Sequence, residues 1–128
     1  MTLQSIYDAA LRLVCEEADG SEDYEERASY LLPTFCAHCR ESEARYRKAH
    51  DMDAGSIPTS LYWELTEEFP LCDIFVAPAT YYLAAMLALD ENETLSEKLF
   101  ALYTDALASI ETALPTQAAP ITDRYKLL

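Results

Sequence analysis

The chain has 128 residues, of which 51% are hydrophobic, so it is long enough to bury one core and too short for two independent domains. It contains only two glycines, which argues against an all-β fold with many tight hairpins and against a glycine-rich phosphate-binding loop. It carries 23 acidic and nine basic residues, and this net charge of −14 disfavours direct binding to nucleic acid.

The longest apolar run predicts a buried helix rather than a membrane span. This run, residues 74–89, contains Pro78 and is shorter than the ~20 residues needed to cross a bilayer. The first residues lack a basic segment followed by an apolar run, so we expect no secretory signal and no membrane association. The default compartment is the cytoplasm, where the four cysteines would stay reduced.

The first half of the chain predicts two helices. The first has Thr2 as its N-cap, should end near Gly20, and has an apolar stripe of Leu3, Ile6, Ala10 and Leu13. The second stripe consists of Tyr24, Ala28, Leu31, Leu32, Phe35 and Cys39. Because Pro33 removes a backbone donor inside this helix, we expect a kink or a break into two shorter helices within residues 30–35.

The second half predicts a connector, two helices and a tail. Residues 51–70 should be an ordered connector with a short strand or one helical turn at residues 61–65. A helix starting at Asp73 or Pro78 should end near Leu89 and pack antiparallel to a last helix. The stripe of that last helix is Leu95, Leu99, Leu102, Ala106, Ile110 and Leu114. The sequence thus predicts an all-α bundle of about four helices over residues 1–114 and an extended C-terminal tail over residues 115–128.

Cys36 and Cys39 have the spacing of a zinc-binding or redox pair. A zinc site would need further ligands from scattered positions, and a redox dithiol usually belongs to a βαβ setting. Since both cysteines share a helix face with Leu32 and Phe35, packing in the core is the favoured interpretation, with free thiols and no metal.

Other polar residues do not form a recognisable catalytic group. We expect His38 and His50 on the surface, and the carboxylates of Glu64, Glu67 and Glu68 in a solvated connector. The sequence therefore predicts no catalytic residue and no cofactor.

Two charge clusters stand out. Four of the nine basic residues are close together, namely Arg40, Arg45, Arg47 and Lys48, whereas seven carboxylates lie within residues 16–26. A solvated helix face or loop is the simplest explanation of both clusters.

Several segments follow a recognisable pattern. They are residues 77–92 (APATYYLAAMLALDEN) and 99–107 (LFALYTDAL), with residues 2–14, 23–28 and 64–72. The pattern resembles the small helical head-tail connector (adaptor) proteins of tailed bacteriophages and prophages, although Pro33, Cys36 and Cys39 do not belong to it.

The resemblance implies a ring of copies docked beneath the portal protein, which extends the DNA channel toward the tail. Its partners would be the portal, neighbouring copies and tail-completion proteins, and an acidic wall would let DNA pass without specific binding. In a cyclic ring each subunit has two complementary faces. The candidate interface residues are Arg40, Arg45, Arg47, Lys48, Glu22, Glu25, Glu26, Arg124 and Lys126.

Two alternatives remain. An acidic protein of this size can mimic DNA and inhibit a nucleic-acid-binding enzyme, which would require carboxylates spread over one continuous face. An enzyme that uses Cys36 and Cys39 ranks third.

Overall fold

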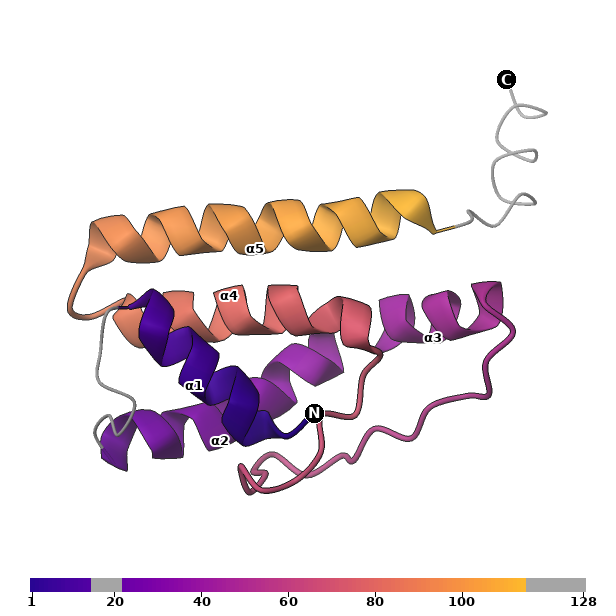
Figure 1. Ribbon diagram of the computed structural model, residues 1–128, viewed down its shortest axis with the longest axis horizontal. Helices are drawn as coiled ribbons and strands as arrows, with labels where there is room; N and C mark the ends of the chain where they lie inside the picture. The colour runs from indigo at the N-terminus through magenta and orange to yellow at the C-terminus, as the bar shows by residue number, and fades with distance from the viewer. Residues whose placement is uncertain (15–21, 115–128) are drawn as a thin grey trace, which may run out of the picture.

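The computed structural model describes residues 1–14 and 22–114. The regular elements of these residues are five α-helices and one 3-10 helix, without a β-strand (Figure 1). In chain order they are α1 (Leu3–Leu13), α2 (Glu22–His38), α3 (Arg40–Ala49), η1 (Asp73–Phe75), α4 (Val76–Ala88) and α5 (Glu93–Ala113). The predicted all-α bundle is confirmed, with one helix more than expected. The predicted tail lies outside the described residues.

Helix α1 begins as predicted and ends earlier. The Thr2 hydroxyl accepts a hydrogen bond from the Ser5 amide at 3.3 Å and so caps the helix. The helix ends at Leu13 instead of near residue 20, because the apolar stripe that packing would stabilise stops there. Leu13 itself is exposed, contrary to the prediction, since it lies about 200° around the helix from the buried Leu11.

Pro33 does not break α2, and the second helix boundary comes later, at Cys39. The helix continues through residues 30–35, and its ribbon bends along its length in Figure 1, in keeping with a kink. A proline at this position leaves the Ser29 carbonyl without its usual donor four residues on. The Trp63 amide of the connector supplies the missing donor at 3.0 Å. The proline therefore creates an attachment point for the connector.

The connector between α3 and η1 is irregular. Residues 61–65 form neither a strand nor a helical turn, contrary to the prediction. Their backbone is used by α1: the Gln4 amide donates to the Leu65 carbonyl (2.8 Å), and the Leu3 amide donates to the Glu67 carbonyl (2.9 Å). Amides at a helix start have no partner inside the helix, so the connector completes the first turn of α1.

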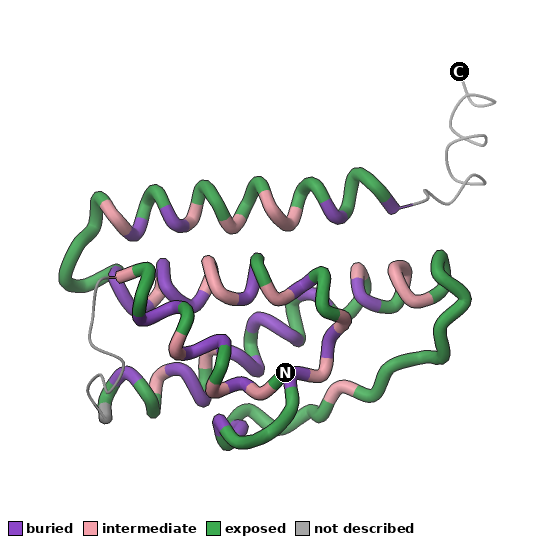
Figure 2. The backbone as a smooth tube through the Cα atoms, in the orientation of Figure 1, coloured by how far each residue is buried: buried purple, intermediate pink, exposed green. Residues whose placement is uncertain are grey.

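Helix α4 is the centre of the core. Its residues Leu83, Ala84 and Leu87 are buried, and it packs against α1, α2 and α5. Figure 2 shows buried residues concentrated where α1, α2 and α4 meet. The Arg27 guanidinium of α2 donates to the Met86 carbonyl at 2.9 Å, which satisfies an acceptor in the last turn of α4. The prediction of a buried core helix is confirmed.

Helix α5 runs antiparallel to α4 and forms the outermost layer (Figure 1). The Asn92 side chain accepts from the Leu95 amide (3.1 Å) and caps its first turn. Leu99 and Ile110 are buried as predicted, but Leu102 is 47% exposed because α5 packs mainly on one helix and a narrow face suffices. None of the described helices combines the length and the apolar character that a membrane span requires.

Candidate functional site

Helix α3 carries the predicted basic cluster, but its four cations do not form one patch. Arg40, Arg47 and Lys48 line an open cavity of about 260 Å³ between α3 and the start of the connector. Arg45 lines a different cavity, together with Glu111 of α5. Tertiary structure therefore divides the cluster between two sides of the helix.

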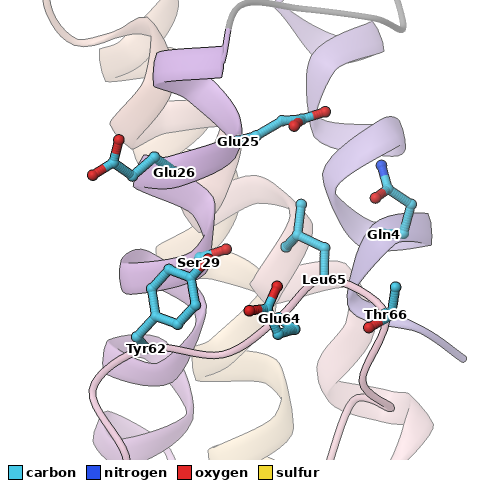
Figure 3. Close-up of a pocket in the computed structure, with 8 residues that line it drawn as sticks. All are labelled: Gln4, Glu25, Glu26, Ser29, Tyr62, Glu64, Leu65 and Thr66. Atoms are coloured by element: carbon cyan, nitrogen blue, oxygen red, sulfur yellow. The ribbon is translucent and has the colours of Figure 1, made fainter.

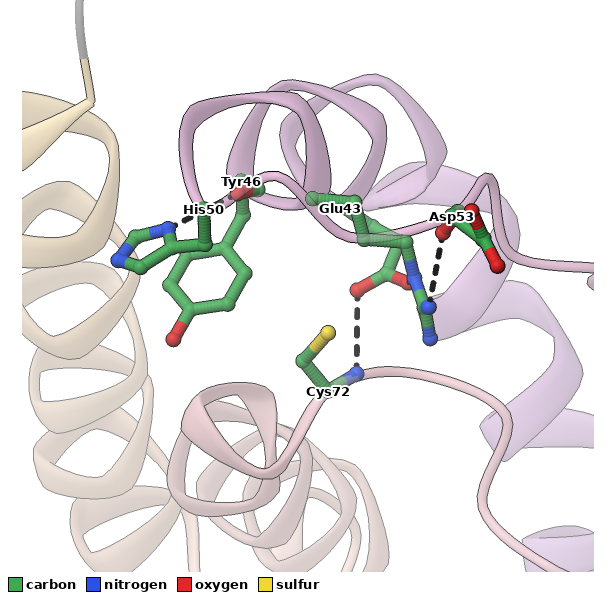
Figure 4. A network of polar contacts seen from close by, with 6 residues as sticks. Glu43, Tyr46, His50, Asp53 and Cys72 are labelled. Atoms are coloured by element: carbon green, nitrogen blue, oxygen red, sulfur yellow. Dashed lines mark hydrogen bonds and ion pairs between the residues drawn. The ribbon is translucent and has the colours of Figure 1, made fainter.

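Arg47 is engaged within the chain. It forms an ion pair with Glu43, whose side chain is 2% exposed, and also donates to the Asp53 carbonyl at 3.2 Å (Figure 4). The second oxygen of Glu43 accepts from the Cys72 amide at 3.1 Å. The hydrogen bond with Glu43 raises the pKa of Arg47. This network ties α3 to the two ends of the connector.

Gly55 packs closely against this network. A Cβ atom at Gly55 would lie 2.8 Å from Arg47 Nε and 3.1 Å from Glu43 Oε1. The sequence does contain a signal for the ion pair, because Glu43 and Arg47 are four residues apart on a helix. It contains no local signal for the burial of Glu43.

Arg40 and Lys48 are exposed, and neither side chain forms a hydrogen bond or ion pair with another residue that the structure describes. They are therefore the members of the cluster that remain open to an external anionic group.

Part of the acidic cluster lies in the first two turns of α2. Glu25 and Glu26 are exposed, and Glu22 lies in the first turn, while residues 16–21 lie outside the described residues. Figure 1 shows α3 at one end of the longest axis of the molecule and the start of α2 at the other. The predicted tail residues Arg124 and Lys126 also lie outside the described residues.

Cys36 and Cys39 are buried free thiols at the end of α2, as predicted. Burial raises the pKa of both, that of Cys39 to about 12, so both thiols are protonated at neutral pH. Within residues 1–14 and 22–114, no group of three or more His, Cys, Asp or Glu side chains is placed to hold a metal ion.

The histidines and the connector carboxylates lie where the sequence predicts. His38 and His50 are exposed, and the His50 ring stacks on Tyr46 with 4.2 Å between centroids. The three connector carboxylates are also exposed, and Glu68 forms an ion pair with the N-terminal amine.

A third open cavity, of about 460 Å³, lies between α1, α2 and the connector (Figure 3). Glu25, Glu26 and Glu64 are among its lining residues, with Ser29 and Tyr62, and Figure 3 shows the Glu26 carboxylate directed away from the others. Sequence reasoning missed this site, because its residues come from three segments that are far apart in the chain.

Comparisons of the chain with family models, with curated proteins and with solved structures give no match.

Proposed function

We propose that the protein is a structural subunit of the head-tail connector of a tailed phage or prophage. It assembles in the host bacterial cytoplasm into a ring beneath the portal and becomes part of the virion neck. It works by assembly with the portal, with neighbouring copies and with tail-completion proteins, rather than by catalytic turnover.

One observation carries this proposal: two exposed cations without a side-chain partner among the described residues lie on α3, and two exposed anions lie near the start of α2, which is at the other end of the longest axis. The exposed cations Arg40 and Lys48 are on α3, and the exposed anions Glu25 and Glu26 are near the start of α2 (Figure 1). A contact between unlike ends of identical subunits is heterologous, and it closes into a ring when the rotation between neighbours permits. The charges would steer association and set the register of the contact.

The overall charge supports the same proposal. With 23 acidic residues against nine basic ones, a ring of copies would give a channel wall that offers DNA phosphates few cationic partners. The protonated state of the buried thiols Cys36 and Cys39 makes them poor nucleophiles, which favours assembly over an enzyme built on them.

The test uses two charge-reversed variants, Arg40→Glu/Lys48→Glu and Glu25→Lys/Glu26→Lys. Each is mixed with the portal protein encoded by the same genome, and ring formation is followed by sedimentation and electron microscopy. We expect each variant to assemble much more slowly than wild type, because its two ends then carry like charges. A mixture of the two variants should recover assembly, since unlike ends meet again. Arg47 is left unchanged because it pairs with the buried Glu43.

The matched control is Glu97→Lys/Asp105→Lys, which reverses two exposed charges on α5. It should assemble like wild type. Wild-type rates for Arg40→Glu/Lys48→Glu at both low and moderate salt would contradict the proposed contact.

A second candidate function is a DNA-mimicking inhibitor. It is favoured by Glu25 and Glu64, which are exposed and line one cavity, so that acidic side chains of α2 and of the connector lie on one surface. Inhibition of a DNA-binding enzyme by wild type, lost in Glu25→Lys/Glu26→Lys and unaffected by Arg40→Glu/Lys48→Glu, would support this function over the connector.

A further inference from the structure

The cavity of about 260 Å³ between α3 and the start of the connector, here called the α3 cavity, is lined by cations in an otherwise acidic chain. Arg40, Arg47 and Lys48 contribute positive charges to it, and the only acid among its described lining residues is Glu43, which pairs with Arg47. The α3 cavity therefore has a net positive charge, whereas the chain as a whole has a net charge of −14. Such a local excess of cations attracts an anionic group.

The connector wall of the α3 cavity is held in place by the backbone. Asp51 has a positive φ of 54°, and its amide donates to the Lys48 carbonyl at 3.3 Å. The Met52 amide donates to the Arg47 carbonyl at 2.8 Å. These two hydrogen bonds form the Schellman motif that commonly ends a helix, and they fold the connector back along α3. The site is therefore pre-formed, which reduces the entropy that a ligand must overcome.

Arg47 is held in one orientation at the α3 cavity and has donors to spare. A guanidinium has five N–H groups. Arg47 uses one for Glu43 and one for the Asp53 carbonyl, so the other three have no hydrogen-bond partner among the described residues (Figure 4). A guanidinium that is already oriented binds a carboxylate with little further loss of side-chain freedom.

The cations lie toward the two ends of the α3 cavity, with apolar groups between them. Arg40 and Lys48 are eight residues apart on α3, which separates them by about 12 Å along the helix axis. Ala44 lies halfway between them, and Met52 and Ile57 of the connector also line the cavity. An extended peptide covers about 12 Å in about four residues. The spacing therefore matches a segment with an acid at each end and apolar residues in the middle.

The composition of the α3 cavity favours carboxylates over phosphate. Phosphate sites commonly use backbone N–H groups at a helix N-terminus or in a glycine-rich loop. Here Arg47 and Lys48 come from the last turn of α3, and apolar connector residues line the same cavity. A peptide that carries acidic and apolar side chains uses both kinds of surface, whereas a phosphate ion uses only the cations.

We propose that the α3 cavity binds an extended acidic segment of a partner protein, in which two carboxylates about four residues apart flank apolar residues. One carboxylate would pair with Arg40 and the other with Arg47 and Lys48. This goes beyond the ring contact and does not depend on it, because the isolated chain contains the whole cavity. Since Arg40 and Lys48 also belong to the ring contact, a bound segment should slow ring formation.

The experiment titrates the full chain with the blocked pentapeptide EALAE and follows the backbone amides by NMR. Shifts should concentrate in α3 and in residues 52–57. The peptide AEELA has the same composition with adjacent acids, so its carboxylates reach only one end of the cavity and it should bind about fivefold more weakly. The peptide EASAE, which lacks the leucine, should bind about threefold more weakly. Inorganic phosphate at matched ionic strength should not displace EALAE.

Two variants locate the site. Arg40→Gln/Lys48→Gln should weaken EALAE binding about fivefold. The matched control, Arg12→Gln/Lys98→Gln, removes two exposed cations on α1 and α5 and should change affinity less than about twofold. Arg47 is left unchanged because it pairs with the buried Glu43. Thermal melts of each variant check that the fold is retained.

Equal affinities for EALAE and AEELA would overturn the proposal, because binding would then depend on charge and not on spacing. Equal losses in the control and the cavity variant, or displacement of EALAE by inorganic phosphate, would overturn it as well. A chain that does not bind EALAE but still forms rings with the portal would remove this inference and leave the connector function standing.

Discussion

Two regions of the molecule are held together by different forces. The pair α4 and α5 is joined by apolar packing along two long helices, with Leu83, Leu87 and Leu99 buried between them and the rest of the core. Helix α3 is strongly polar and is attached mainly through one buried carboxylate, Glu43, and through the Tyr46 ring, whose centroid lies 6.2 Å from that of Phe75. A destabilising substitution between α4 and α5 should therefore lower the stability of the whole domain. A destabilising substitution at the attachment of α3 should mainly loosen α3.

The largest effect is expected from Leu99→Asp in α5. Leu99 is 4% exposed, so the new carboxylate would be buried without a partner at a cost of about 4 kcal/mol or more. Thermal unfolding followed by circular dichroism should show a lost or strongly lowered transition.

The control for this prediction is Leu102→Asp, which makes the same change three residues away at an exposed position of the same stripe. Its free energy of unfolding should stay within about 0.5 kcal/mol of wild type. Equal effects of the two substitutions would mean that α5 does not pack through the face described.

Removing the carboxylate of Glu43 tests the second region. Glu43→Ala would remove the acceptor of Arg47 Nε and of the Cys72 amide, and we expect a loss of about 3 kcal/mol of stability in urea denaturation. Hydrogen exchange should show faster amide exchange in α3 than in α4. The reference variant Arg40→Ala, at an exposed cation of the same helix, should change stability by less than about 0.5 kcal/mol.

The buried thiols lie at the junction of the two regions and predict a loss of stability at alkaline pH. Burial raises the pKa of Cys36 and Cys39 above the ordinary value of 9.0, so the unfolded chain loses these protons first as pH rises. Stability is therefore complete below about pH 8.5 and falls above it, by about 1 kcal/mol per thiol near pH 9.5.

The variant Cys36→Ala/Cys39→Ala checks this titration. It should lose a modest packing contribution at pH 7, keep its ability to assemble, and show a smaller decline in unfolding free energy between pH 8 and 9.5. An unchanged decline would assign the alkaline effect to other groups.

The smallest effect concerns the attachment of the connector. Pro33→Ala would restore an amide that competes with Trp63 for the Ser29 carbonyl. We expect the Trp63 amide to exchange about tenfold faster with solvent, while global stability changes by about 1 kcal/mol. An unchanged exchange rate at Trp63 would show that the connector is held by its contacts with α1 instead.

The sequence by itself determined the helical class and the cores of individual helices, because an apolar stripe with a period of 3.6 residues is a local property. It correctly predicted the cap at Thr2, the antiparallel pair of final helices, and the burial of Cys36 and Cys39. It also located the basic segment that becomes α3. It misplaced Leu13 and Leu102, because periodicity does not reveal how wide a face the neighbouring helices cover.

Only the tertiary structure decided which polar side chains have a partner within the chain and which are exposed without one. Arg47 and Arg40 are equally charged in the sequence, but the fold places Glu43 and the Asp53 carbonyl against Arg47 and leaves Arg40 exposed. The cavity that joins Ser29 and Glu64 likewise has no local signature. Burial of a polar group depends on segments that meet only after folding, and this is why the candidate site could not be assembled from the chain order of its residues.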